Sequence, residues 1–340
     1  MQMSRMQSEL ISRQRSSRLR ARRKRANVSP KPAVTTEVFY NLAYQELSVE
    51  FDRAEKALIY HMHPRRRPCF TTELLEEISQ VYESVRQVYK LWDGEGDPPI
   101  RYLVATSRIK GVFNLGGDID MFATQIRLRN EQAIRSYARQ CIDCVYTNAI
   151  DLKLPIVTIS LVQGDALGGG GFEAALSSDV VIAERSAKFG LPEVLFNLFP
   201  GMGAYSLLGR RVTPAIARRV ILEGKTHSAE ELHEMGVVDV VADDGKGREA
   251  LYDYFRRLHR QANTHRAIYQ ITRRVHPISY SELADVVDLW VQTAMQLNET
   301  DLRRMERLAA AQTRLMARHR GENRPVRKVA GASKTPRQSP

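Results

Sequence analysis

The sequence predicts an α/β protein built on a mainly parallel sheet. Between residues 47 and 183, strand-like apolar runs alternate with longer segments of helical periodicity, and this alternation is typical of crossover units with parallel strands. Hydrophobic residues make up 43% of the 340 residues, so the chain can bury a large core. After residue 192 the pattern becomes mostly helical. We therefore expect a sheet-based core followed by a helical region.

The first half of the chain supplies most of the predicted sheet. Two alternating runs, 47–51 and 57–63, predict a hairpin. Strands are also expected at 101–106 and 112–115, and helices at 118–129 and 131–152. A helix over 71–92 is predicted from apolar residues at helical spacing, namely Leu74, Leu75, Ile78, Val81, Val85, Val88 and Leu91.

The second half begins with a buried strand at 156–162, which leads into four glycines, a helix at 172–177 and a strand at 180–183. Ser228 and Ser279 each precede a Glu by three residues, a pattern typical of a capping box at a helix start. Two apolar stripes follow, and we expect them to pack on the core or on a neighbouring subunit. Their residues are Leu283, Val286, Val287, Trp290, Ala294 and Leu297, then Leu302, Met305, Leu308 and Leu315.

The net charge of +12 is unevenly distributed along the chain. Residues 1–36 hold ten basic residues and one acid (+9), and residues 314–340 hold eight and one (+7), which leaves −4 for residues 37–313. We expect a disordered basic arm over 1–36 and a disordered basic tail over 321–340. Such arms suit phosphate contacts with a nucleic acid or an anionic surface, but residues 1–36 contain no aromatic residue to stack on bases. A solubilising tail or an over-long translation start is the alternative for the first arm.

Composition and motifs exclude several classes of protein. No apolar run approaches the roughly 18 residues that span a bilayer, and no h-region marks a secretory signal, although the Arg- and Ser-rich start overlaps with a mitochondrial transit peptide. Three cysteines predict no disulfide framework, so a reducing cytoplasm is expected. Cys141 and Cys144 form a C-x-x-C motif without a second such pair, and His61 and His63 have no further metal-ligating residue at a suitable spacing. We therefore expect neither a metal nor a cofactor.

The most informative segment joins a strand to four glycines and then a helix, ending at Glu173. Glycines allow close backbone approach, and amides at a helix start favour developing negative charge. The spacing of a dinucleotide or P-loop motif is absent, so the segment suits an oxyanion hole, with a tight packing turn as the alternative. A second glycine turn follows strand 112–115, at Gly116 and Gly117, and supplies another exposed amide.

Two carboxylates accompany these turns. We place Glu173 in the first turn of the glycine-led helix, and Glu193 follows 20 residues later, after one strand. A crossover of that kind returns the chain beside its start, so both carboxylates should flank the glycine backbone. Two amides and two carboxylates suit thioester chemistry, in which one Glu removes a proton at C2 and the other serves the leaving hydroxyl. The alternative for either Glu alone is a solvated carboxylate at a helix start.

These segments resemble the crotonase (enoyl-CoA hydratase/isomerase) superfamily, and within it the bacterial diffusible signal factor synthases. The resemblance covers about residues 40–317. It rests on Val112-Phe-Asn-Leu-Gly-Gly-Asp118, Gly171-Phe-Glu-Ala-Ala-Leu-Ser177, Leu191-Pro-Glu-Val-Leu-Phe196, Phe199-Pro-Gly-Met-Gly-Ala-Tyr-Ser206 and Trp290-Val-Gln-Thr-Ala-Met-Gln-Leu297.

The resemblance implies a spiral ββα fold, with a catalytic core over 37–262 and a helical oligomerisation or lid region over 263–320. It also implies a homotrimer or hexamer. The implied catalytic residues are Glu173 and Glu193, with oxyanion-hole amides at Leu115 and Gly170. The chain has four glycines where the family usually has three, so Gly169 is the alternative donor. The residues expected near the substrate are Gly116, Gly117, Leu191, Val194, Leu195, Phe196, Met202 and Tyr205.

The implied reaction is dehydration of a 3-hydroxyacyl group on acyl carrier protein to a cis-2-enoyl group. Thioester hydrolysis then releases a free fatty acid that serves as a quorum-sensing signal. An ordinary enoyl-CoA hydratase or acyl-CoA thioesterase is the enzymatic alternative. A crotonase-fold scaffold that binds nucleic acid through its arms is a third reading, which the presence of both Glu residues disfavours. The resemblance also suggests a regulatory sensor kinase as a partner, which no residue here indicates.

Overall fold

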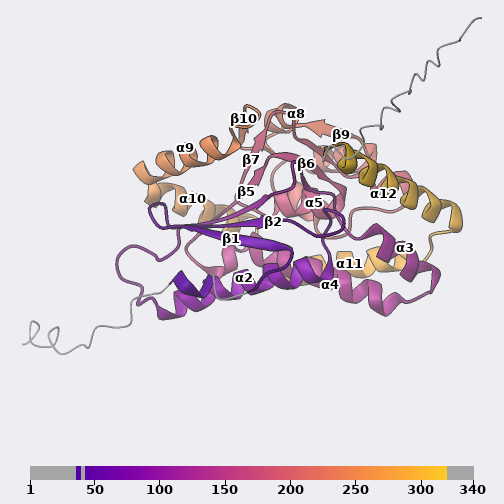
Figure 1. Cartoon of the computed structure of the whole chain (residues 1–340), viewed down its shortest axis with the longest axis horizontal. Helices are drawn as coiled ribbons and strands as arrows, with labels where there is room; N and C mark the ends of the chain where they lie inside the picture. Colours follow the sequence, from indigo (N-terminus) through magenta and orange to yellow (C-terminus); the bar gives the residue numbers. More distant parts are fainter. Residues whose placement is uncertain (1–35, 40–42, 320–340) are drawn as a thin grey trace, which may run out of the picture.

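The computed structural model describes residues 36–39 and 43–319. The predicted basic arm lies outside this part of the chain except for Thr36, and the predicted tail over 321–340 lies wholly outside it. Strands and helices alternate as predicted in the first half (Figure 1). The elements there are η1 (Thr36–Phe39), β1 (Leu47–Asp52), β2 (Ala57–Met62), α2 (Thr72–Leu91), β3 (Tyr102–Ser107), β4 (Gly111–Asn114), α3 (Ile119–Arg127), α4 (Glu131–Ala149), η2 (Asp151–Lys153) and β5 (Val157–Val162).

The second half mixes short strands with helices. Its elements are β6 (Gly164–Leu167), α5 (Gly168–Leu176), β7 (Val180–Glu184), β8 (Lys188–Gly190), η3 (Pro192–Phe196), α6 (Ala204–Leu208), α7 (Pro214–Glu223), β9 (Thr226–Ser228), α8 (Ala229–Glu234), β10 (Val240–Ala242), α9 (Gly247–Arg260), α10 (Ala262–Val275), α11 (Tyr280–Ala294) and α12 (Glu299–His319).

Two sheets form the core, and the strands from β3 to β8 alternate between them. The larger sheet has the order β1-β2-β3-β5-β7-β10, and the smaller has β4-β6-β8-β9. Only the β1–β2 and β8–β9 pairs are antiparallel among these strands. Each of the units β3–β4, β5–β6 and β7–β8 therefore places one strand in each sheet. This repetition gives the ββα spiral that the resemblance implies.

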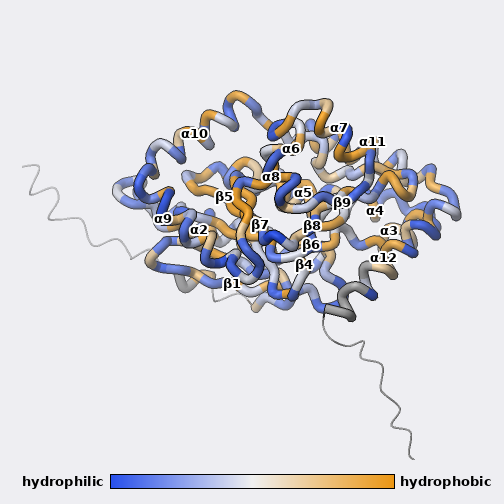
Figure 2. Tube along the Cα trace, turned by 90° about the horizontal axis from the view of Figure 1, so that it is seen from above, coloured by the Kyte–Doolittle hydropathy of each residue, from blue (hydrophilic) through white to orange (hydrophobic). Residues whose placement is uncertain are grey.

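Helices cover both faces of the larger sheet. Along β2, Leu58, Tyr60 and Met62 face the cluster that contains α2 and α4, whereas Ala57 and Ile59 face the cluster with α9. This alternation follows from the two-residue period of a strand. Figure 2 shows hydrophobic positions concentrated along β5 and β7, the central strands. The sheet is thus buried on both sides, as parallel sheets usually are.

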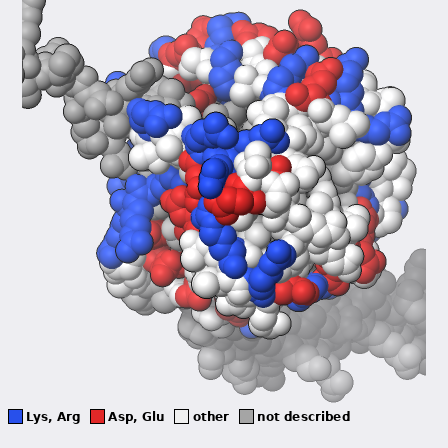
Figure 3. All heavy atoms as spheres, turned by 90° about the vertical axis from the view of Figure 1, so that its right-hand side faces the viewer, with Lys and Arg blue, Asp and Glu red and all other residues white. Residues whose placement is uncertain are grey.

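The C-terminal apolar stripes pack on this chain's own core. Leu283, Val287 and Trp290 of α11 are buried, and α11 lies against α4, while α12 packs on α3 and η3. Arg127 of α3 pairs with two glutamates of α12, and Figure 3 shows basic and acidic side chains interspersed on this end of the molecule. Helix α10 differs, because it has no buried residue.

Several boundaries and caps differ from the sequence-based expectations. Strands β6, β8, β9 and β10, each of three or four residues, were not predicted. The helix predicted for 131–152 ends earlier, where η2 takes left-handed backbone angles. Ser228 forms the complete capping box. Ser279 accepts the amide of Glu282, but the Glu282 carboxylate pairs with Arg210, so the second half of that box is missing. None of the described helices combines the length and apolarity needed to cross a membrane.

Candidate active site

The two glycine turns lie against each other, backbone to backbone. Strands β4 and β6 pair in parallel, with Asn114 opposite Ala166, so their carboxyl ends meet at one edge. A Cβ on Gly168 would lie 2.8 Å from the Leu115 carbonyl oxygen, and one on Gly170 would lie 3.1 Å from the Gly116 Cα. Only glycine permits this approach. The structure therefore brings together the two turns that the sequence singled out.

Glu173 is fully buried, in the second turn of α5. Its Oε1 accepts hydrogen bonds from the amides of Met202 (2.9 Å) and Ala204 (2.8 Å), and its Oε2 has no hydrogen-bond partner among the described residues. The predicted first-turn position is wrong, because α5 begins at Gly168 and not at Phe172. The alternative of a solvated carboxylate is also wrong for Glu173, whose exposed fraction is 0%.

Glu193 approaches the same glycines from the short helix η3. Its Oε1 accepts the amide of Gly169, and its Oε2 is buried without a hydrogen-bond partner in the described chain. A Cβ on Gly169 would lie 3.0 Å from Glu173 Oε2 and 3.2 Å from Glu193 Oε1. The two carboxylates therefore flank Gly169, and each keeps one oxygen unengaged by protein donors.

Burial shifts both carboxyl groups toward the protonated form. Desolvation, followed by the charge of Glu193, raises the pKa of Glu173 to about 8, against the lowering effect of the Ala204 and Met202 amides. Desolvation raises the pKa of Glu193 to about 7, against the Gly169 amide. A carboxyl group has an ordinary pKa of about 4.3. Near neutral pH the pair therefore holds a proton, and Glu193 is the more readily ionised member.

The amides of the glycine turns are not equivalent. Gly169 donates to Glu193, and Leu115 donates to the Pro68 carbonyl at 2.6 Å. The segment before α2 folds over β4, since Phe70 also donates to the Gly116 carbonyl at 2.8 Å. Gly170 is the third residue of α5, a position whose amide has no acceptor within its own helix. Of the expected donors, Leu115 and Gly169 are thus engaged by the protein itself.

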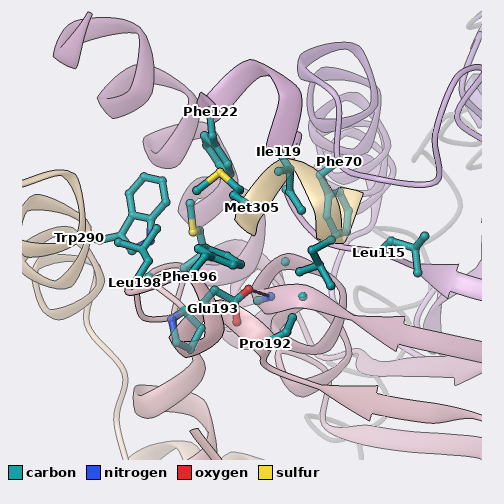
Figure 4. Close-up of a pocket in the computed structure, with 18 of the residues that line it drawn as sticks. Phe70, Leu115, Ile119, Phe122, Pro192, Glu193, Phe196, Leu198, Trp290 and Met305 are labelled. Atoms are coloured by element: carbon teal, nitrogen blue, oxygen red, sulfur yellow. Dashed lines mark hydrogen bonds between the residues drawn. The ribbon is translucent and has the colours of Figure 1, made fainter. Parts of the chain in front are cut away.

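A pocket opens beside Glu193 and the glycine turn, with about 590 Å³ of space not filled by atoms. Apart from Glu193 its walls are largely apolar, and Figure 4 shows Phe196 beside Glu193, with Met305 and Phe122 farther from the Glu193 carboxylate. The sequence analysis did not select Phe122, Trp290, Met305 or Leu308 as site residues. They come from α3, α11 and α12, and only their apolar periodicity was visible in the sequence.

The residues expected near the substrate are only partly gathered here. Gly117, Phe196 and Met202 line the pocket, while Gly116 lies directly behind, against Gly168 and Gly170. The remaining four do not line it: Leu191 is fully buried, Val194 half-buried, and Leu195 and Tyr205 are exposed. Val194 and Leu195 share the short helix η3 with Glu193 but take other sides of it, Leu191 precedes η3, and Tyr205 belongs to α6.

The chain is similar to known proteins in sequence and in fold. Residues 56–316 match the family model of the enoyl-CoA hydratase/isomerase family. The fatty acid oxidation complex subunit alpha of Pseudomonas syringae is 30% identical over 188 residues, which cover 55% of this chain and 24% of that protein. A probable mitochondrial enoyl-CoA hydratase 2 of Arabidopsis thaliana is 28% identical over 186 residues, or 55% of this chain and 56% of that protein. The chain therefore matches about a quarter to a half of these relatives' lengths.

Solved structures share the fold. The enoyl-CoA hydratase of Bacillus halodurans superposes with a TM-score of 0.63 at 21% identity, covering 77% of this chain and 99% of that one. Pseudomonas aeruginosa DspI superposes with a TM-score of 0.57 at 25% identity, covering 72% and 95%. The family model spans most of the chain, and the spiral fold agrees with it. The chain therefore belongs to the enoyl-CoA hydratase/isomerase family, within the crotonase superfamily.

Proposed function

We propose that the protein dehydrates a 3-hydroxyacyl thioester to a 2-enoyl thioester between Glu173 and Glu193. The observation that carries this proposal is the pair of buried carboxyl groups on the two sides of Gly169, each with one oxygen that no described protein group engages. A desolvated acid and base of unlike pKa are what elimination across two adjacent carbons requires.

We assign the roles from the geometry, since Glu193 lines the pocket and Glu173 does not, and the more strongly raised pKa of Glu173 fits the acid. Glu193, with a pKa of about 7, is the base that takes the proton from C2, and the C–H electrons form the enolate. Glu173, with a pKa of about 8, is the acid that protonates the C3 hydroxyl as the C3–O bond breaks and water leaves. One proton is taken up and one is given, so exchange between the two carboxyl groups or with water resets the pair.

The enolate oxygen requires amide donors. The Gly170 amide, at the start of α5, is the first donor. The Leu115 amide is the second, provided that the substrate oxygen replaces the Pro68 carbonyl that it now contacts. Gly169 is assigned instead to holding Glu193. This assignment makes Gly169 a positioning residue and Gly170 the donor.

The finer proposal is a diffusible signal factor synthase. The substrate is a 3-hydroxyacyl group on acyl carrier protein, the enoyl product is cis-2, and water then adds to the thioester carbonyl and releases a free acid and the carrier thiol. The motif resemblance and the similarity to DspI support this assignment. Assembly into a trimer or hexamer is supported by Ile268, Ile271 and Val275 of α10, which stay exposed in the single chain.

An ordinary enoyl-CoA hydratase is the second candidate, because the family model and the Arabidopsis relative carry that description. The test supplies purified protein with 3-hydroxyacyl carrier protein and, in parallel, 3-hydroxyacyl-CoA, and identifies products by mass spectrometry. A free cis-2-unsaturated acid from the carrier substrate supports the synthase. A trans-2-enoyl-CoA without free acid supports the hydratase. No product above that of a Glu173→Ala, Glu193→Ala double variant refutes dehydration itself.

A further inference from the structure

The Leu115 amide, which the proposed reaction needs as its second enolate donor, is covered by the chain segment before α2. The Pro68 carbonyl oxygen accepts this amide at 2.6 Å. Leu115 and Gly170 both line the pocket at Glu193, so a substrate oxygen bound between their amides must compete with Pro68 for one of them. One of the two proposed donors is therefore engaged by the protein itself before substrate binds.

A single peptide unit, the one that joins Pro68 to Cys69, makes this contact. Its C=O accepts the Leu115 amide, and its N–H donates to the Arg67 carbonyl at 2.7 Å. A hydrogen bond between residues two apart closes a γ-turn, here with Pro68 at its centre. Proline fixes φ but not ψ. Rotation of this peptide plane, through ψ of Pro68 and φ of Cys69, therefore breaks both hydrogen bonds together and turns the carbonyl away from Leu115.

The chain directly after this turn is fixed on both of its backbone groups. The Phe70 amide donates to the Gly116 carbonyl at 2.8 Å, and the buried Tyr137 hydroxyl donates to the Phe70 carbonyl. Thr71 then caps α2 by accepting the Leu74 amide at 3.0 Å. Rotation of the peptide is thus confined to the residues before Phe70, and it does not require α2 to shift.

Arg67 supplies the ionic contacts that hold the turn against α3. Its guanidinium lies 3.2 Å from a carboxylate oxygen of Asp118 and 3.2 Å from one of Asp120. The Arg67 side chain is 10% exposed, whereas that of Asp120 is 73% exposed. These pairs fix the backbone of Arg67 and with it the carbonyl that accepts the Cys69 N–H. They therefore favour the orientation in which Pro68 covers the Leu115 amide.

We propose that the Pro68–Cys69 peptide is a switch for the second oxyanion donor, and that Arg67 is the positioning residue that holds it closed. In the closed orientation Pro68 covers the Leu115 amide, and in the open orientation this amide is available to the enolate oxygen. This inference rests on the proposed dehydration, which assigns Leu115 to that oxygen. The apparent affinity for substrate is then reduced in proportion to the fraction of enzyme that is open. Substitutions that weaken the hold of Arg67 should therefore improve substrate binding.

The kinetic test weakens this hold from its exposed end. Asp120→Asn removes one of the two charges that pair with Arg67 and leaves Asp118, the N-cap of α3, in place. Because an exposed ion pair contributes little, KM for 3-hydroxyoctanoyl-CoA should fall roughly two- to fivefold, while kcat changes less than about 1.5-fold. Arg67→Met removes both ion pairs and should lower KM further. Asp285→Asn removes the same charge from an exposed position on α11 and, as the control, should match wild type.

Amide hydrogen exchange in the free enzyme tests the switch without turnover. The Leu115 amide exchanges when its hydrogen bond opens, so its exchange should be faster in Asp120→Asn and Arg67→Met than in wild type. The Gly116 amide, which donates to the Asn114 side chain at 2.8 Å, should exchange at the wild-type rate in both variants and is the internal control.

The two measurements separate this inference from the proposed reaction. If no 3-hydroxyacyl substrate is turned over, the proposed reaction fails, whereas faster exchange at Leu115 alone still supports the switch. Unchanged exchange at Leu115 in both variants overturns the switch. A KM that is unchanged or higher in folded, active variants overturns it as well, because the covering of Leu115 would then not oppose substrate binding.

Discussion

Replacing Glu173 by Gln should abolish turnover. It should also make the protein more stable than wild type at high pH, because the variant does not lose the stability that wild type loses as the pH rises. The Gln side chain keeps an Oε1 that accepts the Met202 and Ala204 amides, and its amide nitrogen takes the place of the unpartnered Oε2. What the substitution removes is a carboxyl group whose pKa is raised from 4.5 to about 8 in the folded protein.

The sign and size follow from proton linkage. A carboxyl with a raised folded pKa stabilises the fold fully below its unfolded pKa, and this contribution is lost as pH rises toward 8. Between pH 5 and pH 9, wild type should lose up to about 4 kcal/mol that Glu173→Gln does not lose. For Glu193→Gln the corresponding figure is about 2–3 kcal/mol, because the pKa of Glu193 is about 7.

Urea unfolding of wild type and variants at fixed protein concentration, from pH 5 to pH 9, measures this difference. The exposed Glu234→Gln substitution is the control, and its stability curve should run parallel to wild type. If the Glu173→Gln curve also runs parallel to wild type across this range, then the buried carboxyl does not hold its proton in the folded state. The assignment of Glu173 as the general acid would lose its basis.

Three other predictions test the candidate site and the structure that supports it. The pH profile of kcat/KM for dehydration should be bell-shaped, with its maximum between the carboxyl pKa values of about 7 and about 8. The value of kcat/KM should fall about 100-fold by pH 5. Initial rates that stay flat from pH 5 to pH 9 would contradict the acid–base pair. Gly171→Ala should prevent folding, since its Cβ would meet the Asn114 carbonyl oxygen at 2.2 Å, whereas Gly169→Ala should fold and lose at least tenfold in dehydration rate. Circular dichroism measures the folding of each variant and initial rates measure its activity. Similar behaviour of the two variants would count against this geometry. Arg273→Met should cost about 3–5 kcal/mol in urea unfolding, because it leaves the buried Asp151 and the mostly buried Asp179 without their shared cation. A cost below about 1 kcal/mol would show that these ion pairs are dispensable.

The elements that the sequence predicted correctly are those with long or strongly periodic patterns. The hairpin β1–β2, helix α2 and strand β5 match their predicted ranges within one or two residues, because each carries enough apolar residues to reveal its period. The short strands β8, β9 and β10 have three residues each. Their pairing depends on partners far along the chain, so local sequence carried no signal for them.

The start of α5 shows how tertiary contacts override propensity. Four consecutive glycines disfavour a helix, and the sequence analysis placed them in a turn before residue 172. In the structure they form its first turn, because a Cβ at Gly171 would clash with the Asn114 carbonyl oxygen and one at Gly170 would crowd Gly116. Close packing against β4 selects glycine here, and the helical conformation follows from that packing.

The residues of the candidate site also differ in how far the sequence predicted them. The position of both carboxylates beside the glycine turn was predictable, because each lies in a short motif next to a glycine or proline. The side chains of Phe122, Trp290 and Met305 were not, since they reach the pocket from helices whose apolar faces look like ordinary core stripes in the sequence. A periodic pattern reports that a residue is buried, but it does not report whether the space beside it is filled.

The fourth glycine illustrates how the backbone sets the chemistry. The fourth glycine before Glu173 raised Gly169 as the alternative oxyanion donor, and in the structure α5 runs without interruption from Gly168 to Leu176. Each glycine has its own contact: Gly168 turns the chain with a φ of +72°, Gly169 holds Glu193, Gly170 faces Gly116, and Gly171 lies under Asn114. Within α5, Gly170 stays three residues before Glu173. The relation between the proposed donor and the proposed acid is therefore set by helix geometry, which an insertion upstream does not alter.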